Sequence, residues 1–304
     1  MAISRAQLVK ELEPGLNALF GLEYKRYDNQ HAEIYTNESS DRAFEEEVML
    51  SGFANANVKV EGSGVNYDQS QETYTARYTH DTIALAFAIT EEAIEDNLYD
   101  RISSRYTKAL ARSMSNAKQV KAAAPLNNGL PTADGFDSGD GVSLFNTAHT
   151  TVSGTNVKNT LTTQADLNET SLEQALIDIA AFTDERGLRV AAKGVKMIIP
   201  SANQFSAERL LKSQGRTGTA DNDINAVASM GMVPQGYRVN NFLTDSDSWY
   251  IITDCPNGMK MFTRAPLTTA MEGDFDTGNV RYKARERYSF GVSDYRGIFA
   301  SPGA

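Results

Sequence analysis

The sequence is poor in the residues from which most catalytic and metal sites are built. Its 304 residues include one cysteine and three histidines. The cysteine, Cys255, cannot form a disulfide within the chain, which fits a reducing compartment. The histidines, His31, His80 and His149, lie far apart in no metal-ligand spacing, and no GxSxG, phosphate-loop or CxxC motif occurs. We therefore predict no catalytic, cofactor-binding or metal-binding residues.

Long hydrophobic runs are also missing. No stretch of about 18 apolar residues could span a bilayer, and the N-terminal segment lacks the apolar centre of a signal peptide. This predicts that the protein has no membrane partner. Acidic residues outnumber basic ones by 39 to 29, a formal net charge of −10, which argues against tight binding of nucleic acid. The 41% of hydrophobic residues is ample for a large core in about two domains.

Three short segments allow a site hypothesis, and each favours a simpler interpretation. Glu272, Asp274 and Asp276 could form an acid pair or a metal site, but a solvated turn between two strands explains them better. Asp134, Asp137 and Asp140 could hold calcium, but their spacing is not that of an EF-hand, so a polar surface loop explains them better. Cys255 follows a predicted strand and could be a nucleophile, although a lone cysteine in a turn is usually inert.

The dominant element is a predicted helix over residues 90–124. It contains no glycine or proline, and acidic residues fill its first third while only basic ones follow, as the helix dipole favours. Thr90 can cap its start and Pro125 can end it. Such a helix would be roughly 50 Å long and would form a spine. Its apolar stripe comprises Ile94, Leu98, Ile102, Tyr106, Leu110, Met114, Ala117, Val120 and Ala124.

Residues 53–89 alternate between polar and apolar instead. Two alternating runs flank a polar turn that contains glycine, and the second run slips in phase near Thr82. Strands of about 15 to 18 residues would exceed the usual length, so we predict a hairpin that projects from the body. The alternative is a hairpin folded back on its own domain. A two-stranded ribbon is marginal in water, so these residues are predicted to lie in a subunit interface: Val58, Lys59, Val60, Tyr67 and Tyr74.

Residues 1–52 are predicted to form an arm. A short amphipathic helix is expected over residues 4–20, interrupted or bent at Pro14 and Gly15. The residues that follow have no clear period, and their apolar side chains are too scattered to form a core. We therefore expect a neighbouring subunit to cover this arm.

The second half of the chain mixes both patterns. We predict a helix over residues 169–185, a buried strand over 194–199, a helix opened by Ser201, and three short strands after it. Alternation returns after residue 279, where one strand face carries Arg281, Lys283, Arg285 and Arg287. Like charges in a row repel, so this row is predicted to face solvent or an acidic or phosphate partner, and it joins the predicted interface.

The order of these elements resembles that of the major capsid proteins of tailed bacteriophages, which have the Johnson fold, also called the Hong Kong 97 type. The segment GVKMIIPSANQFSAERLLKS resembles the start of the axial domain in that family. LFNTAHTTV resembles the LFxTAH segment of Mu-like head subunits, and RYKARERYSFGV resembles the returning strand. The resemblance covers nearly the whole chain.

This resemblance implies an α+β capsid fold in five parts. They are an N-terminal arm (1–52), an extended β-hairpin loop (53–89), a peripheral domain with the spine helix (90–167), an axial domain (168–258) and peripheral return strands (259–304). It implies a structural protein, not an enzyme, that self-assembles into an icosahedral head. The head would enclose double-stranded DNA without binding it tightly.

The implied partners are further copies of the chain, in hexamers and pentamers, with separate scaffold and portal proteins. The implied location is the virion, after assembly in the host cytoplasm. The arm begins close to Met1, so we expect no large cleavage at maturation. Lys59 is the only lysine in the predicted hairpin, and no buried acid marks it for activation, so we expect a shell held together noncovalently.

Three alternatives remain at this stage. A bacterial encapsulin shell shares the fold, and captured cargo or enclosed DNA would distinguish the two. A tail or baseplate component would differ in particle shape. An enzyme of unrecognised type would lose turnover when Cys255 or His149 is changed.

Overall fold

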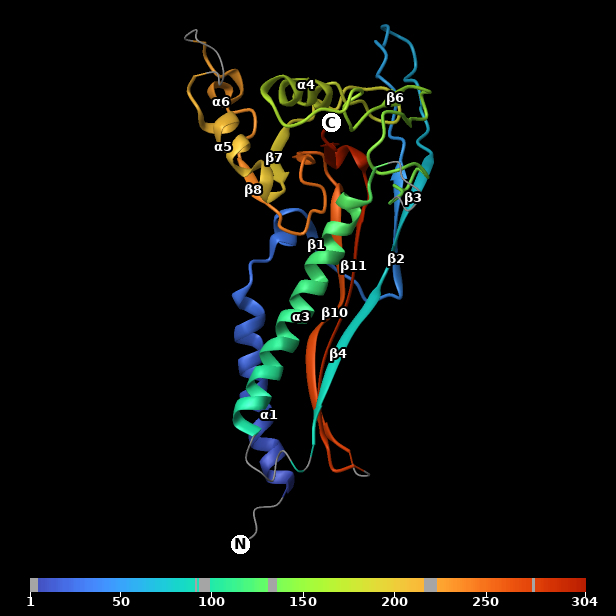
Figure 1. The fold of residues 1–304 in the computed structure, drawn as a ribbon. Helices are drawn as coiled ribbons and strands as arrows, with labels where there is room; N and C mark the ends of the chain where they lie inside the picture. Colours follow the sequence, from blue (N-terminus) through green and yellow to red (C-terminus); the bar gives the residue numbers. More distant parts are fainter. Residues whose placement is uncertain (1–4, 91, 93–98, 131–135, 216–222, 275–276) are drawn as a thin grey trace.

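The computed structural model describes residues 5–90, 92, 99–130, 136–215, 223–274 and 277–304. Helices and strands both contribute, which confirms the α+β class. The molecule is elongated, with two helices and long strands in its lower part and a smaller α/β unit above them (Figure 1). Among the described helices, none is long and apolar enough to cross a membrane.

The lower part is built on a four-stranded sheet, which we call the peripheral sheet. Its order is β1 (Thr36–Ser39), β10 (Met259–Gly273), β11 (Val280–Val292) and β4 (Asp81–Ile89). β1 runs parallel to β10, and the other neighbours are antiparallel. Helices α1 (Arg5–Arg26) and α3 (Tyr99–Asn127) cover one face (Figure 1). Leu16, Phe20, Leu110 and Met114 from these helices pack on Tyr282 and Ala284 of β11.

Helix α3 confirms the predicted spine over its described part. Residues 91 and 93–98 of the prediction lie outside the described residues, and the helix ends three residues beyond Ala124, with Pro125 in its last turn. Its length is about 43 Å. The predicted stripe is partly wrong, because Tyr106 and Val120 are 51% and 50% exposed. Small and polar side chains share the buried face instead, among them Ser103, Thr107 and Ala111.

The upper part contains the axial sheet, of order β12 (Ile298–Ser301), β9 (Trp249–Thr253), β7 (Gly194–Ile199) and β8 (Tyr237–Val239). Around it lie α4 (Glu169–Ala180), α5 (Gln204–Lys212), α6 (Ala226–Met230) and the short pair β5 (His149–Thr150) and β6 (Asn156–Val157). β7, β9 and the two longer helices follow the predicted pattern. The prediction for residues 259–304 needs correction, because β12 returns to this sheet and pairs with β9.

The predicted hairpin also differs from the structure. β2 (Phe44–Leu50) pairs with β3 (Glu72–Thr79) to form a ribbon, while residues 51–71 form no strand. β4 belongs to the peripheral sheet, where it pairs with β11. The slip in the alternation predicted near Thr82 corresponds to this change of sheet, because β3 ends just before His80 and β4 begins just after it. The ribbon therefore begins at Phe44, and its first strand contains three glutamates beside four apolar residues.

The prediction of an uncovered arm is wrong for residues 30–50. Ile34 and Tyr35 are buried in the main core of their own chain, and the Tyr35 hydroxyl donates a hydrogen bond of 2.7 Å to the Ala122 carbonyl. The short helix η1 (Gln30–Glu33) and β1 bring them there. Helix α1 is not interrupted at Pro14 and continues to Arg26. Scattered apolar residues thus find a core supplied by distant parts of the chain.

Candidate functional site

The β2–β3 ribbon is anchored to the body by a buried ammonium. Lys260 on β10 is 6% exposed, and its Nζ lies 2.5 Å from Glu47 Oε1 on β2 and 3.1 Å from Glu38 Oε1 on β1. Burial opposes the charged form of Lys260, but its hydrogen bonds to the two carboxylates outweigh this and raise the pKa above its ordinary value. Lys260 therefore ties the ribbon and β1 to the peripheral sheet.

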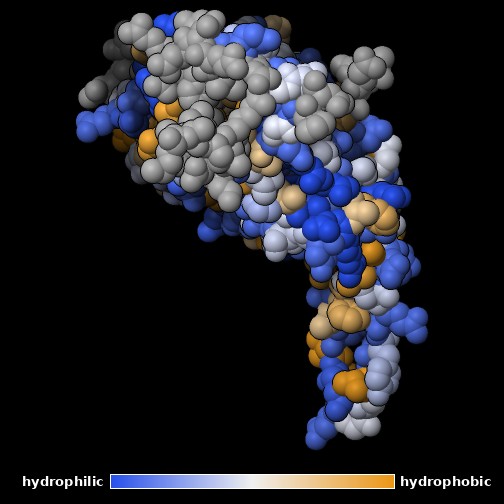
Figure 2. Space-filling view, turned by 90° about the horizontal axis from the view of Figure 1, so that it is seen from below, coloured by the Kyte–Doolittle hydropathy of each residue, from blue (hydrophilic) through white to orange (hydrophobic). Residues whose placement is uncertain are grey.

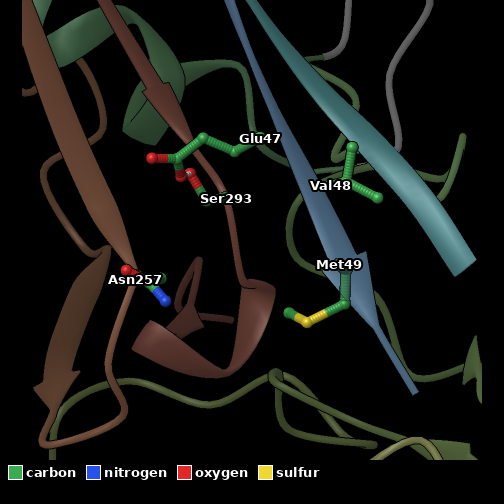
Figure 3. A pocket seen from close by; sticks show the side chains of 5 residues that line it. All are labelled: Glu47, Val48, Met49, Asn257 and Ser293. Carbon is green, nitrogen blue, oxygen red and sulfur yellow. Dashed lines mark hydrogen bonds between the residues drawn. The ribbon is translucent and has the colours of Figure 1, made fainter. Parts of the chain in front are cut away.

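We call the end of the ribbon around Glu47 and Lys260 the ribbon root. A second contact at this root involves Ser293, which follows β11. Its hydroxyl donates a hydrogen bond to Glu47, and Figure 3 shows the two side chains pointing toward one another. The Tyr78 hydroxyl on β3 lies 2.5 Å from the same Ser293 oxygen. Gly291 makes room for Tyr78, because a Cβ there would lie 2.6 Å from the phenol ring. Both strands of the ribbon are therefore held at one point.

A pocket of about 270 Å³ opens beside this anchor. Glu47, Val48, Met49, Asn257 and Ser293 line it (Figure 3). Val48 points toward β3 in that view, away from Glu47. Glu47 and Ser293, two of the polar residues that line the pocket, already serve the anchor, so we assign the pocket to the ribbon root.

Beyond the root, residues 51–71 extend into solvent. Val58 and Tyr67 are each 94% exposed, and Val60 and Val65 are 70% and 64% exposed. Figure 2 shows a narrow projection in which separate hydrophobic patches alternate with hydrophilic ones. Hydrophobic side chains left this far from a core are typical of a surface that another molecule covers. Four of the predicted interface residues, including Lys59, thus lie on an open segment.

Tyr74 does not share this exposure. It packs against the main core of its own chain, and a Cβ at Gly139 would lie 2.6 Å from its ring. The expectation that Tyr74 has no packing within its own subunit is therefore wrong. The reason is that β3 lies against the body from its first residues, and only the segment before it projects.

The predicted row of cations is present on β11. Arg281, Lys283 and Arg285 are exposed and Arg287 is half-buried, while the residues between them face the core. Alternate side chains on a strand are about 6.7 Å apart, so the row is about 20 Å long. Arg281 pairs with Asp274, and the other three form no ion pair within the part of the chain that the structure describes.

Small side chains flank this row on both sides. On β4 the cations lie beside Thr82, Ala84, Ala86 and Ala88, and on β10 three of them lie beside Ala265, Thr268 and Ala270. This face is opposite the one that α1 and α3 cover, and Figure 2 shows strongly hydrophilic side chains near the base of the projection. The result is a flat, basic surface on which an acidic partner could lie closely.

The residues considered for catalysis have other roles. His149 is fully buried, with Nδ1 2.6 Å from Asp140 Oδ2 and Nε2 3.1 Å from Asn159 Oδ1. Burial alone would raise the pKa of Asp140, but hydrogen bonds from His149 and Ser138 lower it below its ordinary value. Burial raises the pKa of the Cys255 thiol to about 11, which leaves almost no thiolate at neutral pH.

The calcium hypothesis finds no support in the described residues. Asp140 is engaged by His149 and Ser138, and Asp137 bridges to Ser143 through its backbone. Asp134 lies outside the described residues. No group of three or more potential ligands gathers elsewhere among the residues that the structure describes.

The chain is similar to known capsid proteins in both sequence and fold. Residues 73–301 match the phage capsid protein family, and no curated protein sequence matches the chain. The capsid of Myoviridae phage XM1 has a similar fold, with a TM-score of 0.54 and 12% identity over 89% of each chain. The capsid of an empty GTA particle gives 0.54 and 13% over 91% of each.

A virus-like particle from Pyrococcus furiosus is also similar, with a TM-score of 0.53 and 11% identity over 95% of this chain and 98% of that one. At such low sequence identities these structures show only that the fold is similar, and the assignment to a family rests on the family match. The Mu-like variant stays a prediction. Since the family match covers most of the chain, from β3 to β12, and the fold agrees with it, the protein belongs to the phage capsid protein family and is a structural capsid subunit.

Proposed function

We propose that the chain assembles into a closed head of hexamers and pentamers in which the β2–β3 ribbon of each subunit lies across the basic row of a neighbour. The observation that carries this proposal is the exposed segment 51–71, whose hydrophobic side chains have no packing in their own subunit. Many weak contacts of this kind, repeated around a shell, give a stable assembly.

Charge supports the pairing of these two surfaces. Residues 44–79 contain six acidic and two basic residues, a net charge of −4. The row on β11 carries four cations, of which only Arg281 has an ion pair among the described residues. Complementary charges steer and orient two copies, whereas two rows of one sign would repel. Glu46, Glu47 and Asp68 are already paired within the subunit, so Glu45, Glu61 and Glu72 are the acids that the ribbon offers to this row.

Several finer statements belong to the same proposal. The head would form in the host cytoplasm with separate scaffold and portal proteins, and it would enclose double-stranded DNA without specific binding. A net charge of −10 suits a container that must not hold its polyanionic content tightly. The subunit would have no enzymatic activity.

The test is a Lys283→Glu, Arg285→Glu double variant. Arg209→Glu on α5 is the matched control, because Arg209 is also an exposed cation but lies outside the basic row. We expect particles, measured by sedimentation and negative-stain microscopy, to be lost in the double variant and kept in the control. Adding Glu61→Lys and Glu72→Lys to the double variant should restore part of the yield. Normal shells from the double variant would contradict the role of the row.

The similarity to a virus-like particle keeps one alternative, a shell that holds a protein cargo instead of a genome. Nuclease-protected DNA in purified particles supports the phage head. A captured protein without DNA supports the alternative.

A further inference from the structure

The groove between α1 and α3 lies on the face of the peripheral sheet opposite the basic row. A pocket of about 580 Å³ opens there, lined by Glu23 of α1, by Tyr27 just after it, and by Lys108, Arg112 and Asn116 of α3. The contacts described so far use neither the groove nor its cations.

One face of α3 points into solvent along this groove. Its residues recur at three- and four-residue spacing and are all exposed: Arg105, Lys108, Ala109, Arg112, Ser113 and Asn116. The first and last of the three cations are seven positions apart, or about 10 Å along the helix. Ala109 and Ser113 lie on the same face beside the cations, and such small side chains allow another helix to approach closely.

The three cations are not neutralised by their neighbours. Within the described residues, Arg105, Lys108 and Arg112 form no ion pair, whereas Lys118 and Lys121 further along α3 pair with Glu286 and Asp81 at 3.1 and 2.5 Å. Glu23 also lines the groove, but it pairs with Arg26 at 3.6 Å and accepts a hydrogen bond from Tyr27 at 3.3 Å. Arg105, Lys108 and Arg112 therefore have no ion-pair partner among the residues that the structure describes.

We propose that this groove binds an acidic amphipathic helix of a second protein, whose carboxylates follow the same helical spacing as the three cations. Such a helix lies along α3, places its acids beside Arg105, Lys108 and Arg112, and packs on Ala109 and Ser113. Duplex DNA fits less well, because the small side chains of Ala109 and Ser113 let another helix pack closely on α3, whereas a phosphate backbone gains nothing from them.

The experiment uses the full chain before assembly, so its outcome does not depend on the shell. The probe is a fluorescein-labelled helical peptide of 21 residues, built from three repeats of seven. Glu occupies the first and fourth positions of each repeat, which gives the spacing i, i+3 and i+7 of the three cations, and the control peptide carries Gln at these positions. Anisotropy should show binding of the Glu peptide only. Lys108→Glu with Arg112→Glu should weaken it by about tenfold or more, because two attractions become repulsions.

Lys108→Gln with Arg112→Gln should give an intermediate loss, and Arg209→Glu should leave binding unchanged. Circular dichroism establishes that each variant is folded, and the Gln pair replaces the Glu pair if the latter is not. The proposal is overturned if the Glu peptide does not bind, if both double variants bind like the parent, or if duplex DNA displaces the peptide.

Discussion

The carboxylate of Asp68 lies against the guanidinium of Arg186, with its two oxygens 2.9 and 3.0 Å from one guanidinium nitrogen. Asp68 belongs to the exposed segment 51–71, whereas Arg186 follows α4 beside the axial sheet. The pKa of Asp68 is lowered chiefly by backbone hydrogen bonds from Ala54 and Gln69, and also by Arg186. In the isolated subunit, this ion pair holds the projecting segment near its own axial part.

Replacing Arg186 with alanine should therefore release the segment. We expect faster tryptic cleavage after Lys59, because the site becomes more mobile, and an almost unchanged melting temperature, because exposed ion pairs contribute little to stability. Arg209→Ala is the control. An unchanged cleavage rate would show that the pair does not restrain the segment.

Removing the segment itself should separate folding from assembly. A variant in which Asn-Gly replaces residues 52–70 keeps the last ribbon pair, since the Ser51 amide donates to the Gln71 carbonyl, and keeps Tyr74 in place. We expect a melting temperature within a few degrees of the parent, because the removed side chains are exposed. Particles should be absent, since each lost apolar contact is worth about 25 cal/mol per Å² at every subunit. Normal particles, or a collapse in melting temperature, would refute this division.

The anchor at the ribbon root should matter for stability instead. Lys260→Met leaves Glu47 and Glu38 without their shared cation, and we expect a loss of about 2–4 kcal/mol in the free energy of unfolding. Urea denaturation measures it. Adding Glu47→Gln should recover part of the loss. Lys212→Met removes an exposed pair with Glu208 and an exposed contact with the Tyr237 ring, and it should have little effect. Equal effects at the two lysines would contradict the anchor.

His31 should make stability depend on pH. Burial, aided by the charge of Lys118, lowers its pKa from 6.5 to about 4. The unfolded chain therefore binds a proton that the folded chain does not between these values, so stability falls as pH drops from 6.5 toward 4. The contribution should be about 2–3 kcal/mol.

A His31→Phe variant isolates this contribution, because its carboxylates titrate as in the parent. Chemical denaturation from pH 7 to pH 4.5 should show a shallower loss of stability in the variant. Parallel curves would mean that His31 does not bind its proton more weakly in the folded state.

Some of these features could be predicted because their pattern is local. The charge-sorted helix around Leu110 and Met114, the apolar strand over residues 194–199 and the alternation of Arg281, Lys283 and Arg285 each need only their own segment. The basic row was found in this way, since one strand face shows directly in the sequence.

Other features could not be predicted, because their cause lies far along the chain. β2 contains three successive glutamates, and Glu47 faces inward only because Lys260 meets it from β10. The same holds for Tyr35, whose hydroxyl needs the Ala122 carbonyl. The groove cations were visible in sequence, but their lack of partners depends on which acids the fold brings to α3.

The passage between the two sheets has a mechanical consequence. β9 continues into β10 and β11 into β12, and the two crossings touch where a Cβ on Gly258 would lie 2.8 Å from the Gly297 Cα. β10 and β11 pair antiparallel in the lower part, and β9 and β12 pair antiparallel in the upper part. Two paired segments of the chain therefore connect the two parts along the long axis (Figure 1). A pull that separates the two parts runs along the strands and across their hydrogen bonds, which then share the load instead of opening one at a time. The subunit is therefore suited to carry tension along its long axis.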